Sequence, residues 1–193
     1  MTPGLHFTGS ARVFNHLWKQ VGSNLLLHKS ADVEHAVNNT VRGAFEYQGQ
    51  KCSACSRMYV PRSLWPQVKQ RLQERVAEIK IGQADHFENF MTAVIDRAAF
   101  NKHKHYIDRA HASPDAEIIA GGTYDDSQGF VVQPTIIVAR DPRYETMQKE
   151  LFGPVLSVFV YEDADWASTL QLVDTTSTYV LTGSIFARER TAI

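Results

Sequence analysis

Two thiols lie three residues apart in the stretch FEYQGQKCSACSRMYV, which spans residues 45–60. Cys52 and Cys55 are the two cysteines of the chain, and cations stand close to them in the sequence at Lys51 and Arg57. This spacing is compatible with disulfide exchange, with half of a zinc site, or with one nucleophilic thiolate beside a bystander. The residues around the pair must decide between these three kinds of chemistry.

The first two kinds of chemistry fit their surroundings poorly. A thioredoxin-like C-x-x-C motif follows a strand and opens a helix, whereas this pair follows a predicted helix and precedes a predicted strand. Structural zinc needs four ligands, and no further cysteine exists. His103, His105 and His111 lie on one predicted helix, where residues two apart cannot share a face. We interpret these histidines as part of a solvated helix face and expect no metal.

A catalytic thiolate needs help to ionise, because the pKa of a free cysteine is about 8.5. It also needs hydrogen-bond donors for the oxyanion that its attack creates. Gly49 permits a tight turn in the loop, so that backbone amides can face a substrate. For a single cysteine, however, a buried structural role is the common alternative. The residues of the loop leave these possibilities open.

The hydrophobic patterns predict alternating helices and strands, and therefore an α/β domain with a mainly parallel sheet flanked by helices. Ser30 and Ser63 are predicted N-caps of the first two helices. Pro134 interrupts one apolar run, which suits an edge strand or two short strands. The last two strands are predicted to be buried on both faces. Helices are expected over 32–45, 63–80, 96–112 and 163–173, and strands over 56–60, 117–122, 129–139, 154–161 and 181–187.

Composition excludes several classes of partner. The chain has 193 residues, is 44% hydrophobic and 21% charged, and carries a formal net charge of -1. These values fit a globular protein with a real core, and they offer no electrostatic case for nucleic acid or an anionic membrane. No apolar run approaches the roughly 20 residues of a membrane span, and the start lacks the pattern of a secretory signal. We expect no nucleic-acid partner and no membrane association.

The whole cysteine segment, FEYQGQKCSACSRMYVP, resembles the active-site signature of the aldehyde dehydrogenase superfamily. Three further segments agree with it in order: FTGS at 7–10, KELFGPVLSVFVY at 149–161 and TTSTYVLTGSIFA at 175–187. FEYQGQKCSACSR together with SLWPQVKQRL at 63–72 is most similar to the branch that acts on glutamate semialdehyde. The resemblance covers nearly the entire chain.

The resemblance implies roles for individual residues. Cys52 matches the nucleophile, so the spacing to Cys55 would be incidental. Ser53 stands where this branch is thought to help hold the carboxylate of the substrate. The backbone amide of Cys52 would supply part of the oxyanion hole.

The resemblance also implies an NAD site. Glu150 matches the acid that binds the nicotinamide ribose, and a carboxylate suits paired hydroxyls as an acceptor. Phe152 would lie beside the nicotinamide ring. Gly9 and Ser10 would lie near the dinucleotide at the start of a helix, where backbone amides favour phosphate.

The implied reaction is the NAD-dependent oxidation of L-glutamate γ-semialdehyde, the open form of 1-pyrroline-5-carboxylate, to glutamate in proline breakdown. It runs through a thiohemiacetal and a thioester on the cysteine. The resemblance further implies a small aldehyde as substrate, the mitochondrial matrix as compartment, and a homo-oligomer for the parent enzyme. No targeting segment is visible in the sequence.

The chain departs from the pattern of the superfamily in several places. The general base should be a glutamate in an E-L-G-G-K-like segment between FTGS and the cysteine motif, yet residues 11–31 hold no acid. We do not assign that role to Glu46, and Val180 stands where a glycine is usual. We expect an incomplete chain, with 1–24 as a remnant of the NAD-binding domain and 25–193 as a partial catalytic domain. Such a fragment should have little or no activity alone. The alternative is a non-catalytic fragment that binds full-length subunits.

Overall fold

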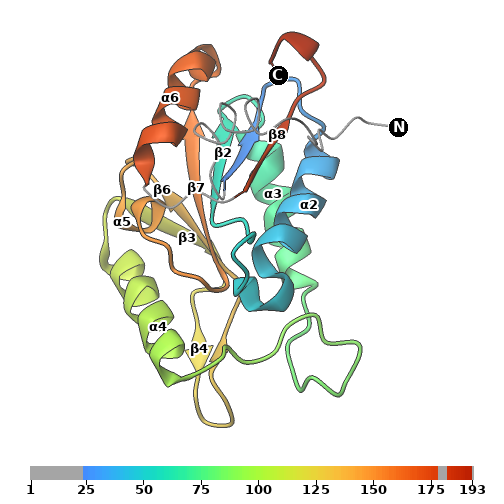
Figure 1. The fold of residues 1–193 in the computed structure, drawn as a ribbon, viewed down its shortest axis with the longest axis vertical. Helices are drawn as coiled ribbons and strands as arrows, with labels where there is room; N and C mark the ends of the chain where they lie inside the picture. The colour runs from blue at the N-terminus through green and yellow to red at the C-terminus, as the bar shows by residue number, and fades with distance from the viewer. Residues whose placement is uncertain (1–23, 178–181, 193) are drawn as a thin grey trace.

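The computed structural model describes residues 24–177 and 182–192, so Gly9, Ser10 and Val180 lie outside the described residues. Helices and strands alternate along most of this part of the chain (Figure 1). In order they are β1 Asn24–Leu27, α2 Val33–Phe45, η1 Glu46–Gly49, β2 Arg57–Pro61, α3 Trp65–Ala77, α4 Arg97–Ala112, β3 Ala116–Ala120, β4 Tyr124–Asp125, β5 Val131–Val132, β6 Thr135–Ala139, α5 Glu145–Gln148, β7 Val155–Tyr161, η2 Asp163–Asp165, α6 Trp166–Thr176, β8 Gly183–Phe186 and η3 Arg190–Ala192.

Six strands of the described part form one sheet in the order β3-β6-β7-β2-β1-β8. Every neighbouring pair is parallel except β3 and β6, which are antiparallel. The prediction of an α/β fold with a mainly parallel sheet is therefore confirmed. The short strands β4 and β5 form a separate antiparallel pair.

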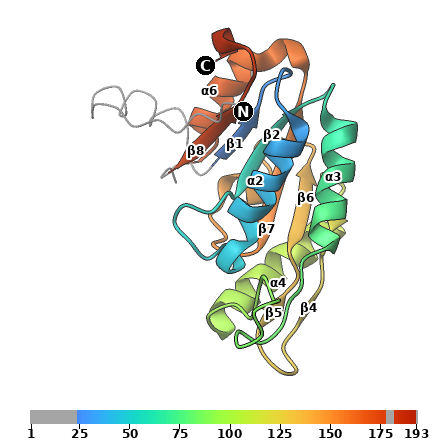
Figure 2. The same cartoon turned by 90° about the vertical axis from the view of Figure 1, so that its right-hand side faces the viewer.

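The period of two along each strand divides the core between the two faces of the sheet. In β1, Leu25 and Leu27 belong to the cluster under α2 and α3, whereas Leu26 belongs to the cluster under α6. In β2, Met58 and Tyr59 divide in the same way. Figure 2 shows α2 and α3 on one side of the sheet and α6 on the other. Helix α4 packs over β3, β6 and the start of β7 in a third cluster.

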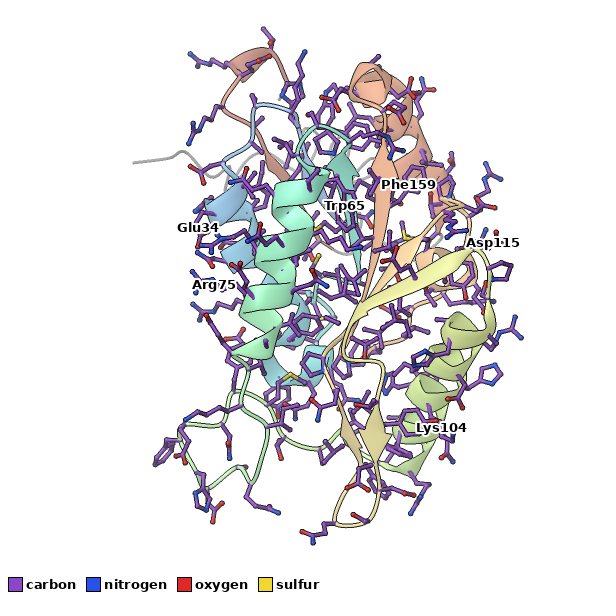
Figure 3. All side chains as sticks on the ribbon, turned by 180° about the vertical axis from the view of Figure 1, so that it is seen from behind. Glu34, Trp65, Arg75, Lys104, Asp115 and Phe159 are labelled. Carbon is purple, nitrogen blue, oxygen red and sulfur yellow. The ribbon has the colours of Figure 1, made fainter. Side chains whose placement is uncertain are left out.

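Ion pairs connect the two helices on the first face. Glu34 of α2 accepts hydrogen bonds from Arg71 and Arg75 of α3, and Figure 3 labels Glu34 and Arg75 at this contact. The shortest nitrogen–oxygen distances to the two arginines are 2.5 and 2.7 Å. Because all three side chains are partly exposed, these pairs contribute little to stability and mainly fix how the helices align.

The structure corrects both predicted helix caps. The carboxylate of Asp32, not Ser30, accepts from the backbone N–H of His35 and begins α2. The Ser30 hydroxyl instead accepts from the N–H groups of Arg188 and Glu189. Helix α3 has no side-chain cap, because its N-cap residue is Leu64, whose side chain cannot accept a hydrogen bond; the N–H of the predicted cap Ser63 donates to Asp163. The predicted proline in the first turn of α3 is confirmed.

Of the two alternatives predicted for 129–139, an edge strand or two short strands, the second is confirmed by β5 and β6, and β6 lies inside the sheet between β3 and β7. Two other strand predictions need correction. Strand β8 is at the edge and only half-buried, although the sequence predicted a strand covered on both faces. No strand was expected at β1, which is fully buried between β2 and β8. Its NLLL sequence has the length of a strand but carries none of the β-branched residues typical of one.

One histidine of α4 is buried, contrary to the prediction of a solvated face for all three. His103 has 0% exposure, because it continues the inward stripe of Phe100 and Ile107. Its Nε2 lies 3.0 Å from the carbonyl oxygen of Leu151, in the loop before β7. Since a carbonyl only accepts, Nε2 carries the proton and donates. His105 and His111 are exposed, as predicted.

Two glycines allow the loops before β2 and β7 to touch. A Cβ atom on Gly49 would lie 2.4 Å from the carbonyl oxygen of Gly153, and the φ of Gly49 is +63°. A Cβ atom on Gly153 would lie 1.9 Å from Nε2 of His103. A side chain at either position would therefore force the loops or the histidine ring apart.

Replacement of Gly153 by alanine should lower the free energy of unfolding by about 1–3 kcal/mol, since the new methyl group collides with the buried His103 ring. The matched control is Gly43→Ala in α2, where the nearest atom to the new Cβ is 3.6 Å away. That change should be neutral or stabilise the helix by up to about 1 kcal/mol. Urea unfolding followed by circular dichroism measures both. Equal effects of the two substitutions would contradict the predicted contact.

Acid should destabilise the fold through His103. Burial lowers the pKa of His103 to about 4, while the unfolded chain protonates this residue near its ordinary pKa of 6.5. Between these two values the unfolded state binds the extra proton, so the free energy of unfolding should fall by about 2 kcal/mol from pH 7 to pH 5. Urea titrations at both pH values should show that His103→Gln loses this dependence. Exposed His105→Gln should keep it, and identical slopes in both variants would oppose the assignment.

Candidate active site

The loop that carries the cysteines is held by hydrogen bonds between its glutamine side chains and the backbone of residues 93–95. Its first residues, Tyr47, Gln48 and Gly49, all have left-handed φ values near +60°. The Gln48 amide group donates to the carbonyl of Ala93, and the side chain of Gln50 accepts from the N–H of Ile95. Two non-glycine residues in this conformation store strain, which the hydrogen bonds of their neighbours offset. The loop therefore has a defined shape.

Cys52 and Ser53 are the two central residues of a tight turn. The N–H of Ala54 donates to the carbonyl of Lys51 at 3.0 Å and closes that turn. Both central residues are exposed. The structure therefore places the Cys52 thiol at the surface, on a loop whose ends are fixed.

Cys55 is half-buried, and its thiol packs inward, against the core cluster under α2 and α3. Its N–H donates to Gly43, and its thiol donates to the carbonyl of Arg57 at 3.4 Å. Burial raises the pKa of the Cys55 thiol to about 12. A thiol that stays protonated at neutral pH is a poor nucleophile and a poor metal ligand. The pair is thus not symmetrical, which disfavours a redox couple.

The second loop of the site lies between α5 and β7. Leu151 is buried, while its neighbours Glu150 and Phe152 are exposed. Phe152 is 39% exposed and has a φ of 56°, the left-handed conformation that few residues with side chains adopt. The loop thus buries Leu151 and leaves a carboxylate and an aromatic ring exposed on either side of it.

A small pocket lies where the two loops meet. Because β2 and β7 are parallel neighbours, with Arg57 opposite Ser157, the loops that enter them must lie at the same edge of the sheet. The cavity is about 20 Å³, room for roughly one water molecule. Its lining comes from both loops and from α5: Gly49, Lys51, Ala54, Cys55, Ser56, Thr146, Lys149, Glu150, Leu151, Phe152, Gly153 and Val155.

The charged side chains near the cysteine loop already form hydrogen bonds within the protein. Lys51 donates to Glu46 at 2.6 Å, and this bond is the main reason that the pKa of Glu46 is lowered. Arg42 bonds the same carboxylate. A carboxylate held ionised by two cations is a weak base, which agrees with leaving Glu46 without a catalytic role. Arg57 is buried, and it donates to the carbonyl of Met147 in α5.

The structure therefore places Glu150 and Phe152 in the lining of the pocket, whereas Cys52 and Ser53 lie on the adjoining cysteine loop but not in that lining, to which Lys51, Ala54 and Cys55 contribute. Gly9 and Ser10 lie outside the described residues. Sequence reasoning missed His103, which supports the second loop from α4. Its position three residues after Phe100 and four before Ile107 was the available signal.

Two other kinds of feature are absent from residues 24–177 and 182–192. No group of three or more His, Cys, Asp or Glu residues there could hold a metal ion. No helix in this part is long and apolar enough to cross a membrane.

Comparison with known proteins gives a consistent answer. The model of the aldehyde dehydrogenase family matches residues 2–193. The mitochondrial delta-1-pyrroline-5-carboxylate dehydrogenase of Dictyostelium discoideum is 54% identical over 211 residues, covering 98% of this chain and 38% of its own length. The human mitochondrial enzyme of the same name is 48% identical, with 98% of this chain and 37% of its own length covered.

A solved structure agrees as well. The crystal structure of delta-pyrroline-5-carboxylate dehydrogenase from Mycobacterium tuberculosis bound with NAD superimposes with a TM-score of 0.81 at 36% identity. The superposition covers 99% of this chain and 38% of the chain from Mycobacterium tuberculosis. The chain thus spans less than two fifths of the length of these relatives. On its sequence and its fold, the chain belongs to the aldehyde dehydrogenase family.

Proposed function

We propose that this chain carries the thiol-bearing part of an NAD-dependent dehydrogenase for L-glutamate γ-semialdehyde. The observation that supports this best is that the loop carrying the exposed Cys52 shares a pocket with the loop of Glu150 and Phe152, through the neighbours Lys51 and Ala54 of that cysteine. The relatives named above are pyrroline-5-carboxylate dehydrogenases at about half identity. The substrate class proposed is a small aldehyde that carries a carboxylate.

The chemistry begins when the Cys52 thiolate attacks the aldehyde carbon, so that a carbon–sulfur bond forms and the oxygen takes a proton. Loss of a hydride from that carbon, to the acceptor that bound NAD would supply, and release of the proton on the oxygen to solvent leave a thioester on Cys52. Water then adds to the thioester carbon, the carbon–sulfur bond breaks, and glutamate and the free Cys52 thiol are released. Ser53, exposed beside the nucleophile, is proposed to donate a hydrogen bond to the far carboxylate of the substrate.

The residues of the second loop fit NAD, which supplies a hydride acceptor when bound. The relative from Mycobacterium tuberculosis has been crystallised with NAD. In this chain, the exposed Glu150 carboxylate can accept from paired ribose hydroxyls, and the exposed Phe152 ring offers a face for a flat heterocycle. We propose that Gly9 and Ser10 contact the dinucleotide phosphates.

A gap in the alignment with one relative concerns the last step of the reaction, the hydrolysis of the thioester. The Dictyostelium alignment runs over 211 residues although it includes only 98% of the 193 residues of this chain, so part of the relative has no counterpart here. We propose that the gap removes the segment with the general base, between FTGS and β1, because residues 11–31 hold no acid. Without a carboxylate to activate water, hydrolysis of the thioester should be slow.

The same relatives suggest how the chain is organised and where it acts. We propose that residues 25–193 belong to the catalytic domain and residues 1–24 to the NAD-binding domain. Since the two relatives are named as mitochondrial, we propose the mitochondrial matrix as the compartment.

A second candidate function is a non-catalytic fragment that binds full-length subunits of the same enzyme. Large apolar side chains are exposed around the segment 82–95: Phe87 is 100% exposed and Ile95 81%. Tyr47, in the adjoining cysteine loop, is 68% exposed. Exposed apolar groups in this number mark a contact surface. Co-purification of a tagged chain with the full-length enzyme would favour this candidate.

Alkylation should separate the two thiols. Iodoacetamide at pH 7.5 should label Cys52 at least tenfold faster than Cys55, because the Cys55 thiol is protonated and held by the Arg57 carbonyl. Peptide mapping by mass spectrometry gives both rates. In 6 M urea, used as the control at about twice the midpoint expected for a small domain, the rates should converge. Preferential labelling of Cys55 in the folded chain would refute the assignment of Cys52 as nucleophile.

Turnover should stop at the thioester. The purified chain, mixed with pyrroline-5-carboxylate and NAD, should release at most a single equivalent of NADH and retain a glutamyl adduct. Absorbance and intact-mass spectrometry measure the two products. Cys52→Ala should lose both, while Cys55→Ala should keep both. Sustained NADH release that depends on Cys52 would disprove the loss of the base, whereas absence of any adduct would count against catalysis.

A further inference from the structure

The loop of Glu150 and Phe152 depends on few contacts for its shape. The Leu151 side chain is buried, and its carbonyl accepts the hydrogen bond of His103 at 3.0 Å. The next residue with a constrained environment is Gly153, which packs directly against the same imidazole ring. One side chain from α4 therefore meets the loop at two successive points.

In this position His103 can act only as a hydrogen-bond donor to the loop. It is fully buried, so it cannot reach a substrate, and its Nδ1 atom is buried without a hydrogen-bond partner. Burial also keeps the ring neutral at physiological pH. A neutral imidazole with a single N–H has one donor to offer, and that donor is directed at the loop backbone, chiefly at the Leu151 carbonyl with a weaker backbone interaction at Phe152.

The direction of that hydrogen bond decides how the loop presents its side chains. With the Leu151 carbonyl directed at α4, the following residue takes the left-handed φ of 56° that turns the Phe152 ring outward. Glu150, on the other side of Leu151, is likewise outward. Loss of the donor leaves the buried carbonyl unsatisfied, which costs about 1–3 kcal/mol and favours rotation of the peptide.

We propose that His103 is a positioning residue that holds the loop 149–153, and through it Glu150 and Phe152, in the conformation that receives the nicotinamide ribose. The cofactor part of this statement rests on the proposed function, whereas the loop part does not. His103 lies outside the four motifs that carry the family resemblance.

The test uses the full 193-residue chain and three variants. His103→Leu fills the buried position with an apolar side chain and removes the hydrogen-bond donor. His103→Gln retains an N–H at nearly the same reach, since the amide nitrogen of glutamine stands where Nε2 does. His105→Leu, an exposed change on the same helix, is the control for helix effects. Hydrogen–deuterium exchange with peptide resolution is the main readout, and NAD titration by fluorescence is the second.

We expect His103→Leu to raise exchange of the 149–153 segment about tenfold, the effect of losing roughly one buried hydrogen bond. His103→Gln should remain within about threefold of the original chain, and His105→Leu should match it. The dissociation constant for NAD should rise about tenfold in His103→Leu and recover in His103→Gln.

Other results overturn the proposal. Unchanged exchange at 149–153 in His103→Leu would do so, as would a uniform rise across α4 and β7, which indicates simple loss of stability. Failure of glutamine to restore protection would show that the hydrogen bond is not the cause. If the original chain does not bind NAD, or if exchange changes while NAD affinity does not, the cofactor role of the loop fails and the positioning of the loop by His103 stands.

Discussion

The site depends on a contact between two pieces of backbone that no side chain could occupy. Gly49 and Gly153 meet where a Cβ atom on the first would lie 2.4 Å from the carbonyl of the second. This closeness is what lets the cysteine loop and the loop before β7 share a single small pocket. The two loops lead into neighbouring parallel strands, so the sheet brings both loops to the same end of these strands. The two glycines then allow the loop backbones to touch, because neither residue carries a side chain.

Burial separates two thiols that the sequence makes look alike. Cys55 faces the core, where its thiol stays protonated, and Cys52 sits at the corner of an exposed turn. The surrounding charges do not reverse this difference. Lys51 is engaged by Glu46, and Arg57 donates into the core at Met147. A nucleophile in this chain would therefore draw on its exposure and on the backbone amides of its turn, rather than on an adjacent cation.

The loop geometry carries strain that the fold must hold. Tyr47, Gln48 and Phe152 all adopt positive φ values without being glycine. Such conformations persist only where neighbouring groups over-determine them. The bonds of Gln48 and Gln50 to residues 93–95 do so for the first loop, and the His103 bond does so for the second. The inward face of α4 and the segment before it thus belong to the architecture of the site.

The sequence by itself determined the alternation of helices and strands, the parallel character of the sheet, and the family, because hydrophobic periodicity and ordered motifs are local properties of the chain. It also indicated which cysteine to consider, through residues next to Cys52. Strand β1 was missed, because a run of three leucines after an asparagine has no distinctive period. Only the tertiary structure decided that Asp32 rather than Ser30 caps α2, since the Ser30 hydroxyl is taken by backbone N–H groups more than 150 residues away. The burial of His103, the protonated state of Cys55 and the contact of Gly49 with Gly153 were decided in the same way. Each of these arises from atoms far apart in the chain, whose approach is set by the pairing of strands and by the packing of helices on them.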